Sequence, residues 1–231
     1  TKDKYVDNLK EVIEKKKGTA ADINIILASM LEKVNVPSNM VLLSTRDHGF
    51  IREQFPMAKQ LNYVICLVKI GDKMLFLDAT EKFLPMCILP ERCLNGLGLV
   101  ISKTNHGWIE IVPKAKARTS ISSEIALLET GEIKGKVKFT SEGYDACKFR
   151  HDYFKKGEPD YVKEFLADKN WEIGKSEFQD IKEIDRGAQQ IHEFAMTDYG
   201  TLSGNVIYLN PFVAGQTKEN AFKLPSREYP V

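Results

Sequence analysis

Cysteine and histidine, the residues that carry thiol chemistry, are few in this chain of 231 residues, which has four of each. A cysteine attacks a carbonyl as the thiolate, and a histidine is the usual base that removes its proton. The cysteines form no C-x-x-C pair, and Cys87 and Cys93 have no paired histidine nearby, so we expect neither a disulfide scaffold nor a zinc site. Phosphate-loop, dinucleotide, calcium-loop and H-E-x-x-H patterns do not occur. The sequence therefore predicts no metal and no cofactor.

The remaining candidates for chemistry are isolated. His48 lies in the loop Arg46-Asp47-His48-Gly49, and we interpret it as a surface residue, with the lining of a binding groove as the alternative. Cys66 lies inside an apolar run and is interpreted as a small core residue. The other three histidines are interpreted as structural: His106, His151 and His192.

The elements expected to position these groups begin with two helices. Apolar residues at helical spacing predict one helix over residues 1–17 and a second, more deeply buried helix between Thr19 and Pro37. Thr19 suits the N-cap of the second helix, and Asp22, three residues on, suits its first turn.

A sheet is expected to follow these helices. The second and third of its strands flank Gly71-Asp72 and predict a hairpin. The order of helix, helix and antiparallel sheet predicts an α+β fold. The strands are expected over residues 40–45, 60–69, 74–80 and 107–112.

A change in composition and in the pattern of expected elements near Pro113 predicts two domains, residues 1–113 and 114–231. The stretch 113–123 is basic and rich in small residues, which favours a linker. Beyond it, strand patterns surround a helical pair over 141–168. We expect a β-rich C-terminal domain with a helical insert.

Several segments resemble a known family. Gly18-Thr19-Ala20-Ala21-Asp22 opens an apolar helix, Asn62 opens a strand, and Asp78-Ala79-Thr80 closes the next one. Residues 17–95 thereby resemble the core of transglutaminase-like proteins, whose papain-like unit carries a Cys at a helix start, a His on one strand and an Asp on the next. Other segments are similar to transglutaminase-like proteins of the Bacteroidetes cell envelope, in which a β-rich domain follows: 43–49, 78–80, 89–95, 208–211 and 227–230.

The resemblance matches the catalytic Cys to Ala20, the His to Asn62 and the Asp to Asp78. A methyl group cannot attack a carbonyl, and an amide cannot transfer a proton near neutral pH. We therefore expect no intact catalytic triad, and a cleft retained for binding a peptide or protein, or for scaffolding. The residues expected at this cleft, besides Ala20, are Thr19, Asp22, Arg46, His48, Asn62 and Asp78.

The meeting of Asn62 and Asp78 depends on the hairpin. A loop over 69–71 with Gly71 in the left-handed conformation would place the two residues directly opposite each other. A plain two-residue turn at Gly71-Asp72 would place them on opposite faces. The sequence is compatible with both registers.

The composition limits the classes of partner. The 33 basic and 32 acidic side chains leave a net charge of +1, which gives no field to attract nucleic acid. The chain shows no apolar run of membrane-spanning length and no leader pattern.

The resemblance implies a bacterial periplasm or cell envelope and a domain truncated at its N-terminal side. Two alternatives stay open: an active transglutaminase-like cysteine peptidase or acyltransferase that uses an unrecognised Cys, and a purely structural spacer.

Overall fold

The structure is a computed structural model that describes residues 9–54, 57–102 and 106–216. Helices and antiparallel sheets make the chain an α+β protein, which confirms this part of the expected fold class. The described residues form two compact units. The first unit comprises those within Thr1–Arg118, Glu142–His151 and Lys182–Gly187, and the second comprises those within Thr119–Ser141, Asp152–Ile181 and Ala188–Val231.

This division differs from a single boundary after residue 113, because two later segments return to the first unit. Burial explains the return of the first segment. Tyr144 and Cys147, in the opening turns of α3 (Gly143–Lys156), belong to the same apolar core as Leu43 and Ile65 of the first sheet. A contact between residues so distant in sequence leaves no mark on local composition.

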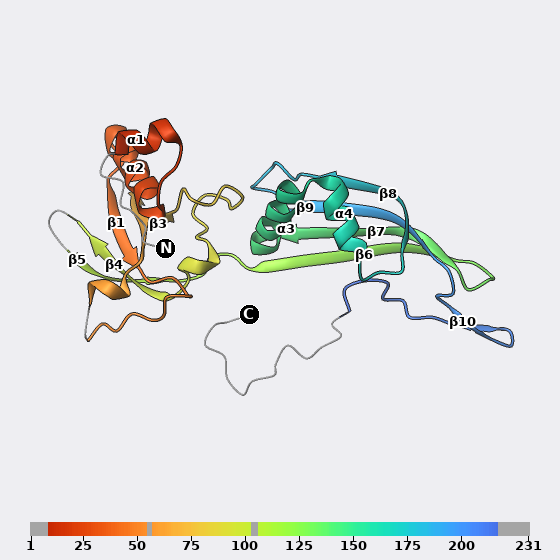
Figure 1. The fold of residues 1–231 in the computed structure, drawn as a ribbon. Helices are drawn as coiled ribbons and strands as arrows, with labels where there is room; N and C mark the ends of the chain where they lie inside the picture. Colours follow the sequence, from red (N-terminus) through yellow and green to blue (C-terminus); the bar gives the residue numbers. More distant parts are fainter. Residues whose placement is uncertain (1–8, 55–56, 103–105, 217–231) are drawn as a thin grey trace. The chain divides into compact units, whose positions relative to one another are not determined.

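The first unit contains a five-stranded antiparallel sheet with the order β3-β2-β1-β4-β5 (Figure 1). Strand β4 was not expected, because the glycines at its start indicate a loop. In the structure Gly98 pairs with Leu43, and a Cβ added to it would lie 2.5 Å from Cγ1 of Val41. Glycine here permits close packing within a strand. The strands are β1 (Ser38–Leu43), β2 (Tyr63–Ile70), β3 (Lys73–Leu77), β4 (Gly96–Ile101) and β5 (His106–Ile111).

Helices α1 (Leu9–Lys15) and α2 (Ala20–Lys33) precede this sheet. The expected start of α2 is confirmed: Thr19 Oγ1 accepts a hydrogen bond from the backbone N of Asp22, and the Asp22 carboxylate accepts one from the backbone N of Thr19. This reciprocal capping box satisfies two backbone donors at the helix start. The remaining residues of the first expected helix, 1–8, lie outside the described residues.

Each face of the first sheet is covered differently. Cys66 Sγ donates to the backbone O of Asn24, so α2 covers the face that carries Cys66. Met40 pairs with Cys66 and therefore shares that face. The opposite face carries the main apolar core, which the segment 83–94 and the opening turns of α3 complete: Val41, Leu43, Ile65, Leu67, Phe76, Phe83, Leu84, Leu89, Cys93, Leu94, Ile111, Tyr144 and Cys147.

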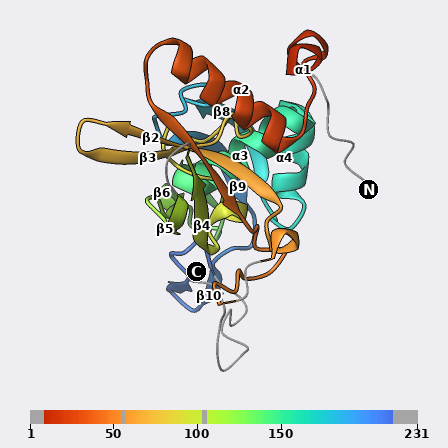
Figure 2. The ribbon, with the colours of Figure 1, turned by 90° about the vertical axis from the view of Figure 1, so that its left-hand side faces the viewer.

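The β2–β3 hairpin turns in two residues. Ile70 pairs with Lys73 across Gly71-Asp72, and Gly71 adopts a φ of +59°. Figure 2 shows this hairpin extending beyond the other strands of the sheet. Since Cys66 pairs with Leu77, the same register would carry Asp78 toward Ile65 and away from Asn62. The register that places Asn62 opposite Asp78 is therefore not the one adopted.

The second unit contains a four-stranded antiparallel sheet with the order β6-β7-β9-β8. Strand β6 begins inside the stretch that was expected to be a linker. Buried residues alternate along β7 and β9, and Phe139 packs edge to face on Phe165 of α4 (Glu158–Leu166), with ring centres 5.4 Å apart. The strands are β6 (Ala117–Leu127), β7 (Ile133–Glu142), β8 (Glu172–Gln179) and β9 (Ala188–Met196), followed by a small pair, β10 (Thr201–Ser203) and β11 (Val206–Tyr208).

Within the described ranges, no helix combines the length and apolarity that crossing a membrane requires. The segment 227–230, which resembles the second domain of the family, lies outside those ranges.

Candidate functional site

Asp78 follows β3 and has a fully buried side chain. Its Oδ1 accepts a hydrogen bond of 2.9 Å from Asn24 Nδ2 and another of 2.9 Å from the backbone N of Thr80. Its Oδ2 accepts a hydrogen bond of 2.9 Å from the hydroxyl of Tyr63. Both carboxylate oxygens are therefore used within the protein. We call Asn24, Tyr63, Asp78, Thr80 and Arg92 the Asp78 network.

Asn24 joins α2 to the sheet. Its side chain is fully buried, its Nδ2 also donates to the backbone O of Val64 at 2.8 Å, and its Oδ1 accepts from the backbone N of Ala79 at 2.9 Å. A buried amide needs such partners because leaving them unmade costs free energy. Asn24 thereby holds Asp78 at a defined distance from the helix.

Arg92 brings positive charge to the network. Its Nη2 lies 3.8 Å from Asp78 Oδ2, and it donates to Tyr63 Oη at 3.0 Å and to Thr80 Oγ1 at 2.7 Å. Burial raises the pKa of Tyr63 to about 12. The phenol therefore stays protonated near neutral pH and donates to Asp78; it cannot act there as a base.

Asn62 is not part of this network. Its Oδ1 accepts a hydrogen bond from the backbone N of Thr45 at 2.9 Å, and its Nδ2 donates to Thr45 Oγ1 at 2.8 Å. Asn62 is exposed, whereas Thr45 is buried. The structure thus places Tyr63, the next residue along the chain, beside Asp78.

Ala20 is the first residue of α2 and lies one turn before Asn24, on the same helix face. The position matched to the catalytic Cys therefore belongs to the face of α2 that reaches Asp78. Thr19 and Asp22 are engaged in the capping box, and Asp22 is buried. These two residues stabilise the helix start.

Arg46 and His48 lie in a loop that the protein anchors from two sides. Arg46 Nε donates to the backbone O of Leu94 at 2.9 Å. His48 is exposed, and its Nε2 donates to the backbone O of Lys59 at 2.8 Å. Asn95 Nδ2 also holds this loop, through the backbone O of Gly49 at 2.8 Å.

Two hollows lie on the face of the first sheet that α2 covers. One hollow, of about 560 Å³, lies between Glu32 of α2 and the paired residues Met40 and Ile101. Two residues further along β1, Leu42 and Leu99 form the floor of an apolar pocket of about 320 Å³. Paired strand residues share a face, so both hollows open on the same side of the sheet. We call them together the α2 groove.

The apolar pocket lies next to the expected cleft. Leu99 pairs with Trp108, which adds an aromatic wall, and Leu61, immediately before Asn62, closes another side. The full lining is Leu42, Ile51, Met57, Ala58, Gln60, Leu61, Leu99 and Trp108. The structure therefore places Leu61, the residue before Asn62, in the lining of a hollow, and it buries the side chain of Asp78.

Three thiols are poorly suited to nucleophilic attack. Burial raises the pKa of Cys66 to about 11 and the pKa of Cys93 and Cys147 to about 12. The nearby carboxylate of Asp78 adds to the effect on Cys93, whose Sγ lies 3.9 Å from Asp78 Oδ2. Because the thiolate is the reactive form, these thiols have little of it near neutral pH.

Three residues of the Asp78 network were missed by the sequence reasoning. Asn24 was detectable, because it is a polar side chain within the apolar stripe of a buried helix. Tyr63 and Arg92 were not, since their approach to Asp78 depends on the hairpin register and on the path of the loop that contains Arg92. Elsewhere among the described residues, metal-ligating side chains gather at Glu81, Cys147 and His151.

No protein-family model matches the chain, and neither a curated protein nor a solved structure matches it. A functional conclusion therefore depends on the geometry described above and on the resemblance of its segments.

Proposed function

We propose that this chain is a catalytically inactive transglutaminase-like protein, with a papain-like core, that binds an extended peptide or protein segment in a bacterial cell envelope. The α2 groove carries the proposal. Its apolar pocket of about 320 Å³ has a floor and wall of Leu42, Leu99 and Trp108. That volume is near the lower end of the range for ligand pockets, which suits one large apolar side chain.

The arrangement of α2 supports the resemblance. A helix with a well-capped N-terminus packs on an antiparallel sheet, and its first turns face the residue that follows a hairpin strand. In transglutaminase-like proteins the corresponding positions hold Cys and Asp. Here they hold Ala20 and Asp78, and Asn24 links the helix to Asp78.

The loss of catalysis is supported by the same contacts. Ala20 has no nucleophilic atom, and Asn62 is hydrogen-bonded to Thr45. Asp78, the remaining member of the triad, orients Tyr63. A triad without its nucleophile and base retains no route to covalent chemistry.

The ligand is expected to lie along α2. A large apolar side chain of the ligand would enter the apolar pocket at Leu42. The backbone and polar groups of the ligand would lie in the larger hollow, of about 560 Å³. That hollow offers polar partners from two elements, Ser29 and Glu32 of α2 together with Ser38 and Asn39 of β1. Directed polar contacts beside an apolar anchor are the usual composition of a selective site.

Selection of peptides from a random displayed library on the full chain tests the proposal. We expect enriched peptides to share a large apolar residue. Ala58 is exposed and lines the pocket, so Ala58→Trp should fill it and weaken a selected peptide by at least about tenfold. The matched control is Met86→Trp, at a position that is 74% exposed and outside the pocket lining.

Two outcomes would contradict the binding proposal: no peptide is enriched, or Ala58→Trp and Met86→Trp bind the selected peptide equally. The first outcome favours the structural-spacer alternative. Hydrolysis or crosslinking of peptide amides by the purified protein, abolished by a single substitution at the cleft, would instead favour the active cysteine enzyme.

A further inference from the structure

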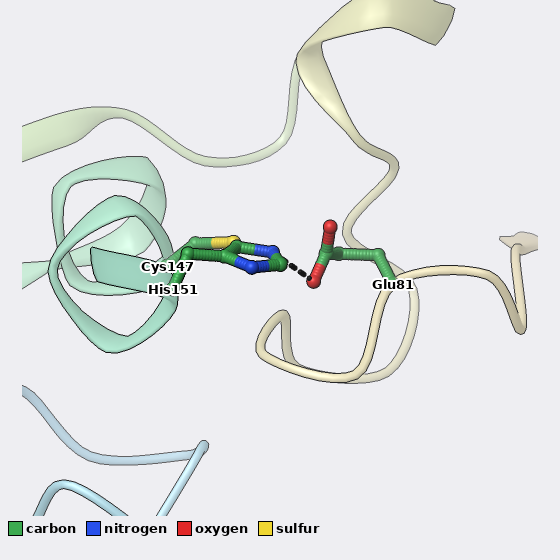
Figure 3. A group of neighbouring side chains, drawn as sticks. All are labelled: Glu81, Cys147 and His151. Atoms are coloured by element: carbon green, nitrogen blue, oxygen red, sulfur yellow. Dashed lines mark hydrogen bonds and ion pairs between the residues drawn. The ribbon is translucent and has the colours of Figure 1, made fainter. Parts of the chain in front are cut away.

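Glu81, Cys147 and His151 bring a carboxylate oxygen, a sulfur and a ring nitrogen within 4.8 Å of one another (Figure 3). Cys147 and His151 are four residues apart on α3 and so point from the same helix face. Glu81 reaches them from the segment after β3. All three residues belong to the first unit.

The protein holds each of these side chains in place. Cys147 is buried in the core, and Tyr144, one turn before it, donates a hydrogen bond of 2.7 Å to the backbone O of Leu89. The backbone N of Phe83 donates to Glu81 Oε1 at 3.1 Å, and the Phe83 ring packs edge to face on His151, with ring centres 4.7 Å apart. Such surrounding contacts are the ones that orient the ligands of metal sites.

We propose that Glu81, Cys147 and His151 form a binding site for a divalent cation of the zinc class. A thiolate and an imidazole together favour zinc and its neighbours over magnesium and calcium, which prefer sets of oxygen ligands. On binding, Cys147 Sγ loses its proton to solvent, and the neutral His151 ring binds the cation through Nε2 and carries its proton on Nδ1.

The ligand atoms lie within 4.8 Å of one another, so loading requires only small movements of the side chains. Tetrahedral zinc sets its ligand atoms about 3.3–3.6 Å apart, given bonds of about 2.0 Å to nitrogen and oxygen and about 2.3 Å to sulfur. His151 Nε2 and Glu81 Oε1 are 2.8 Å apart, because the ring donates a hydrogen bond to the carboxylate. Loading therefore requires these two side chains to separate slightly.

A fourth ligand would come from solvent. The His151 side chain is 49% exposed, whereas the Glu81 side chain is 11% exposed. The cluster is thus covered on the side of Cys147 and Glu81 and accessible at the histidine. Three protein ligands with a water in the fourth position form an open zinc site, in contrast to closed structural sites with four protein ligands.

The experiment is calorimetric titration of the EDTA-stripped full chain with zinc, paired with cobalt(II) absorption. We expect one zinc per chain and a thiolate-to-cobalt charge-transfer band. Glu81→Gln, Cys147→Ser and His151→Gln should each weaken the affinity for zinc by at least about 100-fold. Even the mutation of residues that only hydrogen-bond to metal ligands lowers metal affinity by about 10–100-fold. Cys147→Ser should also remove the charge-transfer band.

Matched controls are Cys87→Ser and His48→Gln, which remove a cysteine and a histidine outside the cluster and should leave both signals unchanged. His151→Gln keeps the test valid if Cys147→Ser fails to fold, because His151 is half exposed. The proposal is overturned if saturable binding is absent, or if zinc binds a folded His151→Gln variant as tightly as the native chain. The α2 groove lies on other residues, so peptide binding should be the same with and without zinc.

Discussion

The hydroxyl of Tyr63 donates a hydrogen bond of 2.9 Å to Asp78 Oδ2, in the place where the resemblance leads one to expect a catalytic histidine. Asn62, the preceding residue, faces Thr45. The difference follows from the two-residue turn of the hairpin, whose register carries Asp78 toward Ile65, on the strand face that Tyr63 shares and Asn62 does not.

Introducing a reactive thiol at the start of α2 should therefore require replacement of Tyr63, and not of Asn62, by a histidine. Ala20→Cys places a thiol at the start of α2, where the helix dipole favours the thiolate. Adding Tyr63→His should raise the alkylation rate of the introduced thiol by about tenfold, because the new imidazole can bond to Asp78 and act as a base. The measurement is iodoacetamide labelling followed by mass spectrometry, in a Cys87→Ser background.

Asn62→His is the matched control for that experiment, and it should leave the rate of the Ala20→Cys variant nearly unchanged. A larger acceleration by Asn62→His than by Tyr63→His would mean that Asn62 reaches the helix start and that Tyr63 does not.

Asn24→Leu should destabilise the first unit strongly. The substitution removes three hydrogen bonds from a fully buried position: those to Asp78 Oδ1 and the backbone O of Val64, and the one from the backbone N of Ala79. We expect a loss of about 3–5 kcal/mol in the free energy of unfolding. Urea unfolding followed by Trp108 fluorescence, in a Trp171→Phe background, measures it.

Ser29→Ala provides the comparison, because Ser29 is an exposed α2 residue whose hydroxyl bonds within the helix. It should change stability by less than about 0.5 kcal/mol. Equal effects of the two substitutions would show that the Asn24 contacts do not hold the helix to the sheet.

Alkylation of the native chain should begin at Cys87. Cys87 is partly exposed, whereas burial raises the pKa of Cys66, Cys93 and Cys147 to about 11, 12 and 12. Near neutral pH fewer than about one in a thousand of these three thiols are ionised at any moment. Peptide mapping after brief iodoacetamide treatment with EDTA present gives the order of labelling. Labelling of Cys66 or Cys93 ahead of Cys87 would favour the active cysteine enzyme.

Stability of the second unit should fall as the solution is acidified, because of His192. Burial lowers the pKa of His192 to about 4, and the charge of Lys169 adds to the effect. The ring is fully buried, bonds to Ser176 Oγ at 2.8 Å and stacks on Phe165 with ring centres 4.7 Å apart. Between the unfolded pKa of about 6.5 and the folded value, the unfolded chain binds more protons, so stability rises with pH.

The contribution of His192 is complete above pH 6.5 and is lost as the pH falls toward 4, by up to about 3 kcal/mol. Urea unfolding followed by Trp171 fluorescence, in a Trp108→Phe background, checks this. His192→Gln should flatten the dependence, and His48→Gln should leave it unchanged. An undiminished slope in His192→Gln would assign the effect to other groups.

Local patterns were sufficient for the helices and for much of the sheet. Thr19 and Asp22 predict the capping box of α2, and the spacing of the apolar residues that follow predicts a buried helix. The hairpin was visible as two apolar runs around Gly71-Asp72. Strand β4 was hidden because Gly98 is selected by contact with Val41 and not by strand propensity.

The candidate site, too, was predictable from the sequence only in part. The expectation of a degenerate triad depends on residue types alone, because Ala20 and Asn62 cannot act as nucleophile and base in any fold. The side chain that meets Asp78 depends on the register of the β2–β3 hairpin, and the sequence is compatible with two turns that give different registers. The α2 groove and the Glu81–Cys147–His151 cluster depend on contacts between segments distant in sequence.

The sequence by itself therefore determined the α+β class and the start of α2, since periodicity and capping are local properties. Only the tertiary structure decided that Tyr63 faces Asp78, that Leu61 lines a pocket and that α3 brings Cys147 and His151 to Glu81. Long-range packing selects among registers and partners that local free energies leave nearly equal.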